Sequence, residues 1–298
     1  MPIGLLTGLG AALAWGTMDI ASALASRQIG SLRVVAGVQL VGATILIAVA
    51  VLTSTGIPTD PTALALSALL GLIGAGAYLS YFTGLRVGPI AVVSGVVAAY
   101  GGLTVVLSVV LRGETLTTLQ ALGALVATVG VILTGIAFEG HWRSTRFAGP
   151  GVVFSVIALI LFAMMAITTD LAIEHAAWLQ VLLVSRIVNA TLGVAVVVVV
   201  VWMAARRAKA DPSAKAMAVP SRRVVATVIL AGMLDVSGLA VFAFGISEAP
   251  TWLVGLASSF GPAVTILIAV AFLGERLKPI QWFGLSGVAL GMVLIAIP

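Results

Sequence analysis

The segment from Pro89 to Gly130 reads PIAVVSGVVAAYGGLTVVLSVVLRGETLTTLQALGALVATVG, and a related segment occupies residues 250–291. Both begin with proline, and 250 − 89 = 161. The same separation relates residues of turns as well as residues of apolar runs, namely Gly84 and Gly245, Gly113-Glu114 and Gly274-Glu275, Gln120 and Gln281, Gly123 and Gly284, and Gly130 and Gly291. Turn residues that recur at one separation indicate that the chain is a duplicated half.

The composition indicates the class of protein. Of the 298 residues, 61% are hydrophobic and 8% are charged, and the mean hydropathy is +1.24. Soluble domains carry about a quarter charged residues and about half apolar residues. We therefore expect a polytopic membrane protein.

The composition also limits the chemistry that the chain can support. It contains no cysteine, and its two histidines, His141 and His175, lie beside predicted loops, so we expect no disulfide, metal centre or other cofactor. The net charge of +5 comes from basic residues in short connectors between apolar runs. Their expected partner is the anionic membrane surface rather than nucleic acid.

Apolar runs of membrane-spanning length recur along the sequence. A hydrocarbon core about 30 Å thick requires about 20 helical residues. The runs are continuous rather than alternating, which favours helices over a β-barrel. The predicted fold is therefore an all-α membrane protein with ten transmembrane helices, near residues 3–25, 32–53, 63–85, 89–111, 117–138, 149–170, 176–203, 223–246, 250–273 and 280–297.

The predicted spans divide into two five-helix repeats, at residues 1–138 and 149–298, joined by a connector at residues 139–148. An odd number of spans in each repeat makes the second repeat enter the membrane from the opposite side. The repeats are therefore expected to be inverted, which is an arrangement of secondary transporters. The alignment of the halves is not uniform, because residues 39–44 match residues 186–191 at a separation of 147, and Asp19 matches Asp170 at 151.

A Gly-Glu turn lies between the fourth and fifth span of each half, within RGETL at residues 112–116 and LGERL at residues 273–277. With ten spans and the duplication, this turn makes the whole chain resemble the EamA type of the drug/metabolite transporter superfamily, and it is similar to bacterial exporters of amino acids, particularly aromatic ones. The resemblance implies export of small amphipathic metabolites across the bacterial cytoplasmic (inner) membrane by alternating access. Thr115 stands where the second half has Arg276, so a role of that arginine need not be shared.

Other functions remain open at this point. The same fold could export other metabolites or drugs, and an intramembrane enzyme or a non-transporting membrane subunit are further alternatives. An enzyme needs a nucleophile with a base or a metal within reach, and the sequence places no histidine in mid-span and has no cysteine. We expect no enzymatic activity, and we expect a small-molecule substrate and membrane lipids as partners.

Three charged residues, Asp19, Arg186 and Asp235, fall inside predicted spans and away from their terminal turns. A charge at the bilayer centre costs at least about 2.5 kcal/mol on insertion scales. Arg186 and Asp235 lie about ten and twelve residues into adjacent spans from opposite faces, so they reach similar depth and are predicted to pair. Asp19 lies nearer a helix end, and both a solvated or capping role and a functional role remain open. Glu114 and Glu275 are expected to favour the positive end of the following helix.

A central cavity between the halves is predicted from large or kink-forming residues in mid-span, which suit an amphipathic and partly aromatic solute. The predicted substrate-binding residues are Trp15, Tyr78, Tyr81, Tyr100, Phe162, Phe260 and Pro262. Pro262 removes a backbone donor from its helix, and its counterpart Gly101 is followed by Gly102. We predict hinges at Gly101, Gly102 and Pro262. Core packing for the aromatic residues and a purely structural kink for the hinge positions are the alternatives.

The first testable prediction concerns orientation. Of the 15 Lys and Arg residues, all but Arg112 and the intramembrane Arg186 lie in or beside odd-numbered connectors. They are Arg27, Arg33, Arg86, Arg143, Arg146, Arg206, Arg207, Lys209, Lys215, Arg222, Arg223, Arg276 and Lys278. The positive-inside rule places these connectors in the cytoplasm and both termini in the periplasm. A C-terminal fusion to an exported phosphatase is expected to be active, and a fusion to a cytoplasmic fluorescent reporter to be dark. The reverse pair of results would contradict this orientation.

Overall fold

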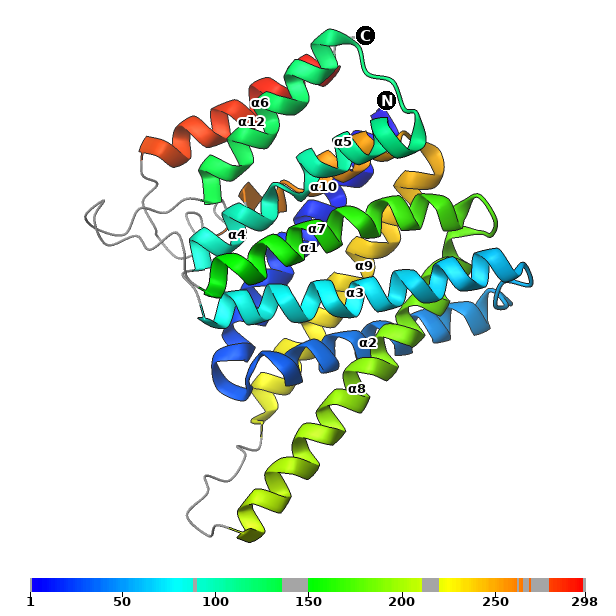
Figure 1. Ribbon diagram of the computed structural model, residues 1–298, viewed down its shortest axis with the longest axis vertical. Coiled ribbons are helices and arrows are strands. Elements are labelled where there is room, and N and C mark those ends of the chain that lie inside the picture. The colour runs from blue at the N-terminus through cyan, green and yellow to red at the C-terminus, as the bar shows by residue number, and fades with distance from the viewer. Residues whose placement is uncertain are drawn as a thin grey trace.

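A computed structural model describes residues 2–87, 90–135, 150–210, 220–261, 263–264, 268 and 279–296, and the described elements are all helices (Figure 1). In the first half they are α1 (Pro2–Ile29), α2 (Ser31–Leu52), α3 (Pro61–Val87), α4 (Ile90–Ala98), α5 (Tyr100–Arg112) and α6 (Thr118–Gly135). In the second half they are α7 (Pro150–Ile173), α8 (Trp178–Ala210), α9 (Arg222–Glu248), α10 (Thr251–Ser258) and α12 (Pro279–Ala296).

The distribution of side chains confirms an all-α membrane protein. Seven helical segments of the described chain are long and apolar enough to cross a membrane, and α6 and α12 contain shorter apolar helices. Large apolar side chains such as Val110 and Phe283 are 71% and 72% exposed, whereas the polar side chains of Gln39 and Ser155 are fully buried. A surface that is apolar across many helices requires lipid around it.

The two halves pack through exchanged pairs of helices. The first helix of each half lies along the third helix of the other half, because α1 packs on α9 and α7 packs on α3. The second helices α2 and α8 pack on each other, and so do the last helices α6 and α12, which lie side by side at one end of the molecule (Figure 1). Reciprocal pairs of this kind are what an approximate twofold relation between two inverted repeats produces.

The contact between α6 and α12 shows this relation at single residues. A Cβ added at Gly123 would lie 2.9 Å from the carbonyl oxygen of Gly291, and one added at Gly130 would lie 2.8 Å from that of Gly284. The counterpart of Gly123 is Gly284 (123 + 161), and the counterpart of Gly130 is Gly291 (130 + 161). Gly123 therefore packs on the counterpart of Gly130, and Gly130 packs on the counterpart of Gly123. Only glycine lets the two backbones approach this closely.

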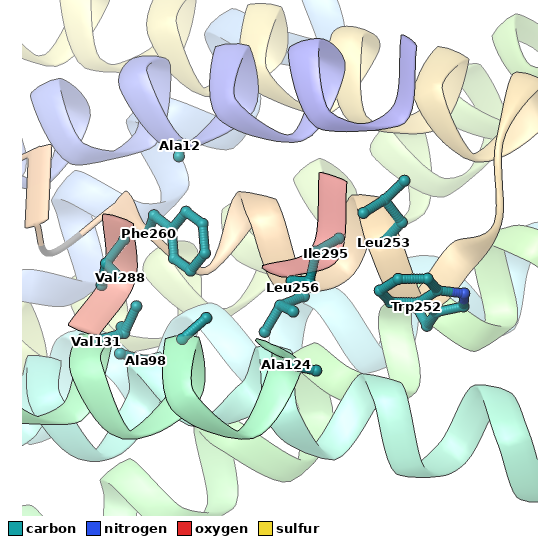
Figure 2. Close-up of a cluster of buried hydrophobic side chains, with 11 residues drawn as sticks. Ala12, Ala98, Ala124, Val131, Trp252, Leu253, Leu256, Phe260, Val288 and Ile295 are labelled. Carbon is teal, nitrogen blue, oxygen red and sulfur yellow. The ribbon is translucent and has the colours of Figure 1, made fainter. Parts of the chain in front are cut away.

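A buried apolar cluster fastens this helix pair to the rest of the protein. It joins α1, α4, α6, α10 and α12 (Figure 2) through Ala12, Ala98, Ala124, Ala127, Val131, Trp252, Leu253, Leu256, Phe260, Val288 and Ile295. Phe260 is 3% exposed within this cluster and lies near Val288. The ring that we predicted in the wall of the central cavity therefore packs in the core.

The fourth predicted span, residues 89–111, is not one helix. It is broken at Ala99 into α4, which ends at Ala98, and α5. The other half has a helix end at nearly the same place, because α10 ends at Ser258 and the counterpart of Ala98 is residue 98 + 161 = 259. Tight turns close both helices, because the backbone N–H groups of Ala99 and Ser259 donate to carbonyls three residues earlier, each at 3.2 Å. Gly101 and Gly102 lie in the first turn of α5, where their low helix propensity weakens the helix next to the break. The rest of the ninth predicted span lies largely outside the described residues.

Helix α8 is longer than predicted. The prediction ended it at residue 203, whereas it continues to Ala210 and extends beyond the neighbouring helices (Figure 1). The added residues are alanine, arginine and lysine, which are strong helix formers, so the helix continues past its apolar run. The guanidinium of Arg206 lies 3.7 Å from the centre of the Trp202 ring.

The predicted role of Glu114 at the start of the following helix is wrong. Helix α6 is capped by its own residues, because Thr117 Oγ1 accepts from the Gln120 N–H at 3.2 Å and Gln120 Oε1 accepts from the Thr117 N–H at 3.0 Å. The Glu114 carboxylate instead accepts from the N–H groups of Thr251 and Trp252, at 2.8 and 3.0 Å, at the start of α10. It therefore caps a helix of the other half. Glu275 lies outside the described residues.

We expect Glu114→Ala to lower the stability of the protein, because the first two N–H groups of α10 lose a charged acceptor. The expected loss in the free energy of unfolding is about 1 to 2 kcal/mol, measured by denaturant unfolding in detergent. Glu248→Ala is a matched control, because Glu248 is exposed and lies just before α10 at the same face. Equal losses in the two variants would contradict the cap.

Candidate functional site

A cavity lies between the two halves at the depth of the helix breaks. It holds about 760 Å³ free of protein atoms, counted with the space that opens outward. Its wall consists of Trp15, Met18, Asp19, Tyr78, Tyr81, Val97, Ala98, Tyr100, Phe162, Met165, Thr169, Leu239, Phe242, Ser258, Ser259 and Gly261. The structure thus brings together Trp15, Tyr78, Tyr81, Tyr100 and Phe162 from α1, α3, α5 and α7, as the sequence predicts.

The aromatic part of the wall is organised around one ring. The centre of the Phe162 ring lies 5.5 Å from that of Tyr78, 6.0 Å from that of Tyr81 and 5.9 Å from that of Tyr100. Tyr78 and Tyr81 meet it edge to face, at interplanar angles of 89° and 77°, which is a favourable arrangement for aromatic pairs. Phe162 of α7 therefore links the tyrosines of the first half to the second half.

Each tyrosine hydroxyl in this wall has a polar partner. Tyr78 donates to Asp235 Oδ1 at 2.6 Å, and Tyr81 donates to Asp19 Oδ2 at 3.0 Å. The hydroxyls of Tyr100 and Ser258 lie 2.8 Å apart. The wall thus combines apolar rings with hydroxyl groups held in place, which suits a solute with an apolar body and a polar end.

The predicted ion pair between Arg186 and Asp235 is confirmed. Arg186 Nη1 lies 2.7 Å from Asp235 Oδ2, and the two side chains are 2% and 0% exposed. Arg186 Nη1 also donates to Gln39 Oε1, and Trp15 Nε1 donates to the Asp235 backbone carbonyl at 3.3 Å. With Tyr78, the pair therefore ties α1, α2, α3, α8 and α9 together behind the cavity.

Sequence reasoning did not assign Gln39 to this network, although a signal was present. Gln39 is the repeat counterpart of Arg186, since 186 − 39 = 147, and the two side chains touch. Counterparts can meet only where the approximate twofold axis passes between them. A small second cavity adjoins Arg186 and shares Tyr78, Met165 and Leu239 with the larger one. Within the described structure, Arg186 Nη2 and Gln39 Nε2 are buried without a hydrogen-bond partner.

Asp19 lies in the cavity wall, well inside α1, rather than at a helix end. The sequence match of Asp19 with Asp170 at a separation of 151 is wrong, because equivalent ring contacts, Trp15 with Phe242 and Phe162 with Tyr81, relate α1 and α7 at a separation of 147. Asp170 instead lies near the end of α7, where it accepts from Arg112 Nε at 2.6 Å, and Glu174 binds the same guanidinium. Among the described residues no group of three or more His, Cys, Asp or Glu side chains could hold a metal ion.

The predicted hinge glycines have a packing role. A Cβ at Gly101 would lie 2.2 Å from Ser259 Oγ, and one at Gly102 would lie 2.6 Å from Thr128 Cγ2. Glycine at these positions lets α5 approach the second half and α6 closely. The break at Ala99 lies just before both glycines, and their function as a hinge stays a prediction. Pro262 lies outside the described residues.

The ion pair gives a second prediction about stability. Removing one partner of a buried pair costs about 3 to 5 kcal/mol, because the other charge is left unpaired. We expect Asp235→Asn to lower the unfolding temperature in detergent sharply, and Arg186→Gln in the same protein to recover part of the loss. The double-mutant cycle measures the coupling between the two side chains. Losses that simply add would exclude an energetic pairing.

Comparison with known proteins agrees with this architecture. The profile of the EamA-like transporter family matches residues 2–136 and 149–297, which is one match in each half. A solved structure described only as "Crystal structure of protein" superimposes with a TM-score of 0.77 over 99% of this chain and 96% of that chain, at 17% identity. This likeness shows the fold alone. No curated protein matches the chain. With both halves matched, the chain belongs to the EamA-like transporter family.

Proposed function

We propose that this membrane transporter exports small amphipathic metabolites, amino acids and aromatic amino acids among them, across the bacterial cytoplasmic membrane. The observation that carries the proposal is the cavity between the halves, which combines an aromatic wall with bound hydroxyls and one carboxylate. The family supplies the transport of small molecules across a membrane. Amino acids and the outward direction come from the resemblance to bacterial exporters, and we propose no catalytic activity for the chain.

The proposed binding residues are Trp15, Tyr78, Tyr81, Tyr100 and Phe162. Their rings line the cavity, and the Phe162 ring lies within 6.0 Å of three tyrosines. An amino acid with an aromatic side chain would stack or pack edge-on against this wall, and its polar end would meet hydroxyl groups. Phe260 is left out of this set because it packs in the core.

Alternating access requires the halves to separate at one face while they close at the other. At the face that carries the N-terminus, four sets of polar contacts join the halves. Arg112 binds Asp170 and Glu174, and the Glu114 carboxylate caps α10. His175 Nδ1 lies 3.4 Å from Asp60 Oδ2, and Gln180 donates to the Gly56 carbonyl at 3.2 Å. We propose that these contacts hold this face closed and break when it opens.

The orientation of these contacts follows from charge. The opposite face carries helix ends with Arg33, Arg86, Arg206 and Arg222, so we propose that it is cytoplasmic and that the N-terminal face is periplasmic. At the N-terminal face, a hydrogen bond from the Thr62 backbone N–H holds the pKa of Asp60 below its usual value. Asp60 therefore remains an anion opposite His175.

Counterflow in proteoliposomes tests the function. We expect protein loaded with one amino acid to exchange it for external amino acids, and aromatic ones to exchange best. Phe162→Ala is expected to reduce exchange of aromatic amino acids by up to about tenfold relative to small aliphatic ones, because one aromatic contact contributes about 0.5 to 1.5 kcal/mol. Phe162 is a sharper probe than Tyr78, whose hydroxyl also binds the buried ion pair.

Phe283→Ala is the matched control, because this ring on α12 is 72% exposed on the outer surface. It should leave the relative rates unchanged. Unaltered relative rates in Phe162→Ala would contradict the assignment of the cavity as the binding site. Absence of exchange for every amino acid and for a panel of other metabolites would favour a non-transporting subunit.

A further inference from the structure

We infer that Asp19 recognises a positively charged amino group of the transported molecule. The inference rests on the proposed transport function and adds to it the chemical group that a substrate must carry. It concerns a residue for which the sequence left a capping role and a functional role equally open, and four observations on the cavity carry it.

The first observation is the charge of the cavity wall. Asp19 is the single charged residue among those that line it; the other polar side chains are hydroxyls and one indole. The nearby charges of Arg186 and Asp235 neutralise each other across 2.7 Å. Among the described residues, Asp19 is therefore the one group of the cavity wall that can carry a charge without a counter-ion from the protein.

The second observation is that Asp19 and Asp235 differ in burial and in the hydrogen bonds that they accept. Asp235 is fully buried, and both of its carboxylate oxygens are occupied, Oδ1 by Tyr78 and Oδ2 by Arg186. Asp19 is half-buried and accepts one hydrogen bond, at Oδ2, from Tyr81. A carboxylate can accept about four hydrogen bonds, so Asp19 retains acceptor capacity toward the cavity whereas Asp235 serves the framework.

The third observation is the absence of a protein cation beside Asp19. Among the described residues, Arg112 forms an ion pair with Asp170 and Arg186 forms one with Asp235, whereas no arginine or lysine forms one with Asp19. A carboxylate within a membrane-spanning helix is costly unless a cation or a proton compensates it. An ammonium group in the cavity would supply that cation.

The fourth observation is the surroundings of the carboxylate. An ammonium group has three donors, and the hydroxyls of Thr169, Ser258 and Ser259 in the same wall can accept those that Asp19 does not. The rings of Tyr81 and Phe162 add surfaces that attract a cation. An organic anion would instead meet an uncompensated carboxylate. The substrate class is thus primary amines with an apolar or aromatic body, amino acids included.

Three aromatic probes of similar size separate the possibilities: L-phenylalanine, 2-phenylethylamine and 3-phenylpropionate. We expect purified full-length protein to bind the two amines, and to bind 3-phenylpropionate at least about tenfold more weakly, as a charged hydrogen bond and its counter-charge contribute about 1.5 to 3 kcal/mol. In Asp19→Asn the ratio of affinities for 2-phenylethylamine and 3-phenylpropionate should fall by at least about tenfold. Asp19→Glu, which keeps the charge, should preserve the preference for the amine.

Glu248→Gln is the control, because it removes an exposed carboxylate outside the cavity; it should leave the ratio unchanged. Thermal unfolding shows whether each variant is folded, and Asp19→Glu decides the question if Asp19→Asn does not fold. A wild-type protein that binds 3-phenylpropionate as well as 2-phenylethylamine overturns the inference, as does an Asp19→Asn variant with the wild-type ratio or an Asp19→Glu variant without the preference.

The same probes keep this inference separate from the proposed function. Preferential binding of the amine that depends on Asp19, with no exchange across proteoliposomes, would support amine recognition and contradict transport. Exchange of amino acids that Asp19→Asn leaves unchanged in rate and in charge preference would support transport and overturn the role of Asp19.

Discussion

The buried ion pair between Arg186 and Asp235 is the constraint around which the middle of the protein is arranged. Neither charge is tolerable alone in the hydrocarbon layer, so each needs the other together with neutral hydrogen-bonding groups. Gln39, Tyr78 and Trp15 provide those groups from three helices of the first half. The pair thus fixes how α1, α2 and α3 meet α8 and α9, and by placing Tyr78 it also fixes one wall of the cavity.

The symmetry of the fold explains where the two halves can differ. Along the approximate twofold axis that relates the halves, counterpart residues touch each other, as Gln39 touches Arg186. If both positions were arginine, like charges would be in contact. Away from the axis, glycines of α6 and α12 are the same in both halves because both serve one backbone contact. Gln39 and Arg186 therefore differ because only one of the two can carry the charge that pairs with Asp235.

Much of this arrangement could be predicted from the sequence, because depth in the membrane follows from the order of residues. The repeat, the spans, the ion pair and the convergence of five aromatic residues all depend on depth. The sequence carries no comparable signal for lateral neighbours. It therefore missed that Glu114 caps α10 of the other half and that Phe260 faces the α6 and α12 cluster. The hinge predicted at Gly101 and Gly102 lies just after the observed break at Ala99, because the sequence identifies residues that weaken a helix but not the turn at which it ends.

The ion pairs of Arg112 make the two inverted halves chemically unequal. If the halves were identical, closing either face would form the same contacts, and the empty protein would have no preference between them. Arg112 binds Asp170 and Glu174 at the N-terminal face, whereas its sequence counterpart in the second half, position 273, is leucine, which cannot form an ion pair. The two halves therefore differ in a side chain that joins them when the N-terminal face is closed. A ligand can shift the balance between the two closed states only through a difference in its affinity for them. Asp19, in the wall of the cavity between the halves, is a place where a cationic ligand could supply such a difference.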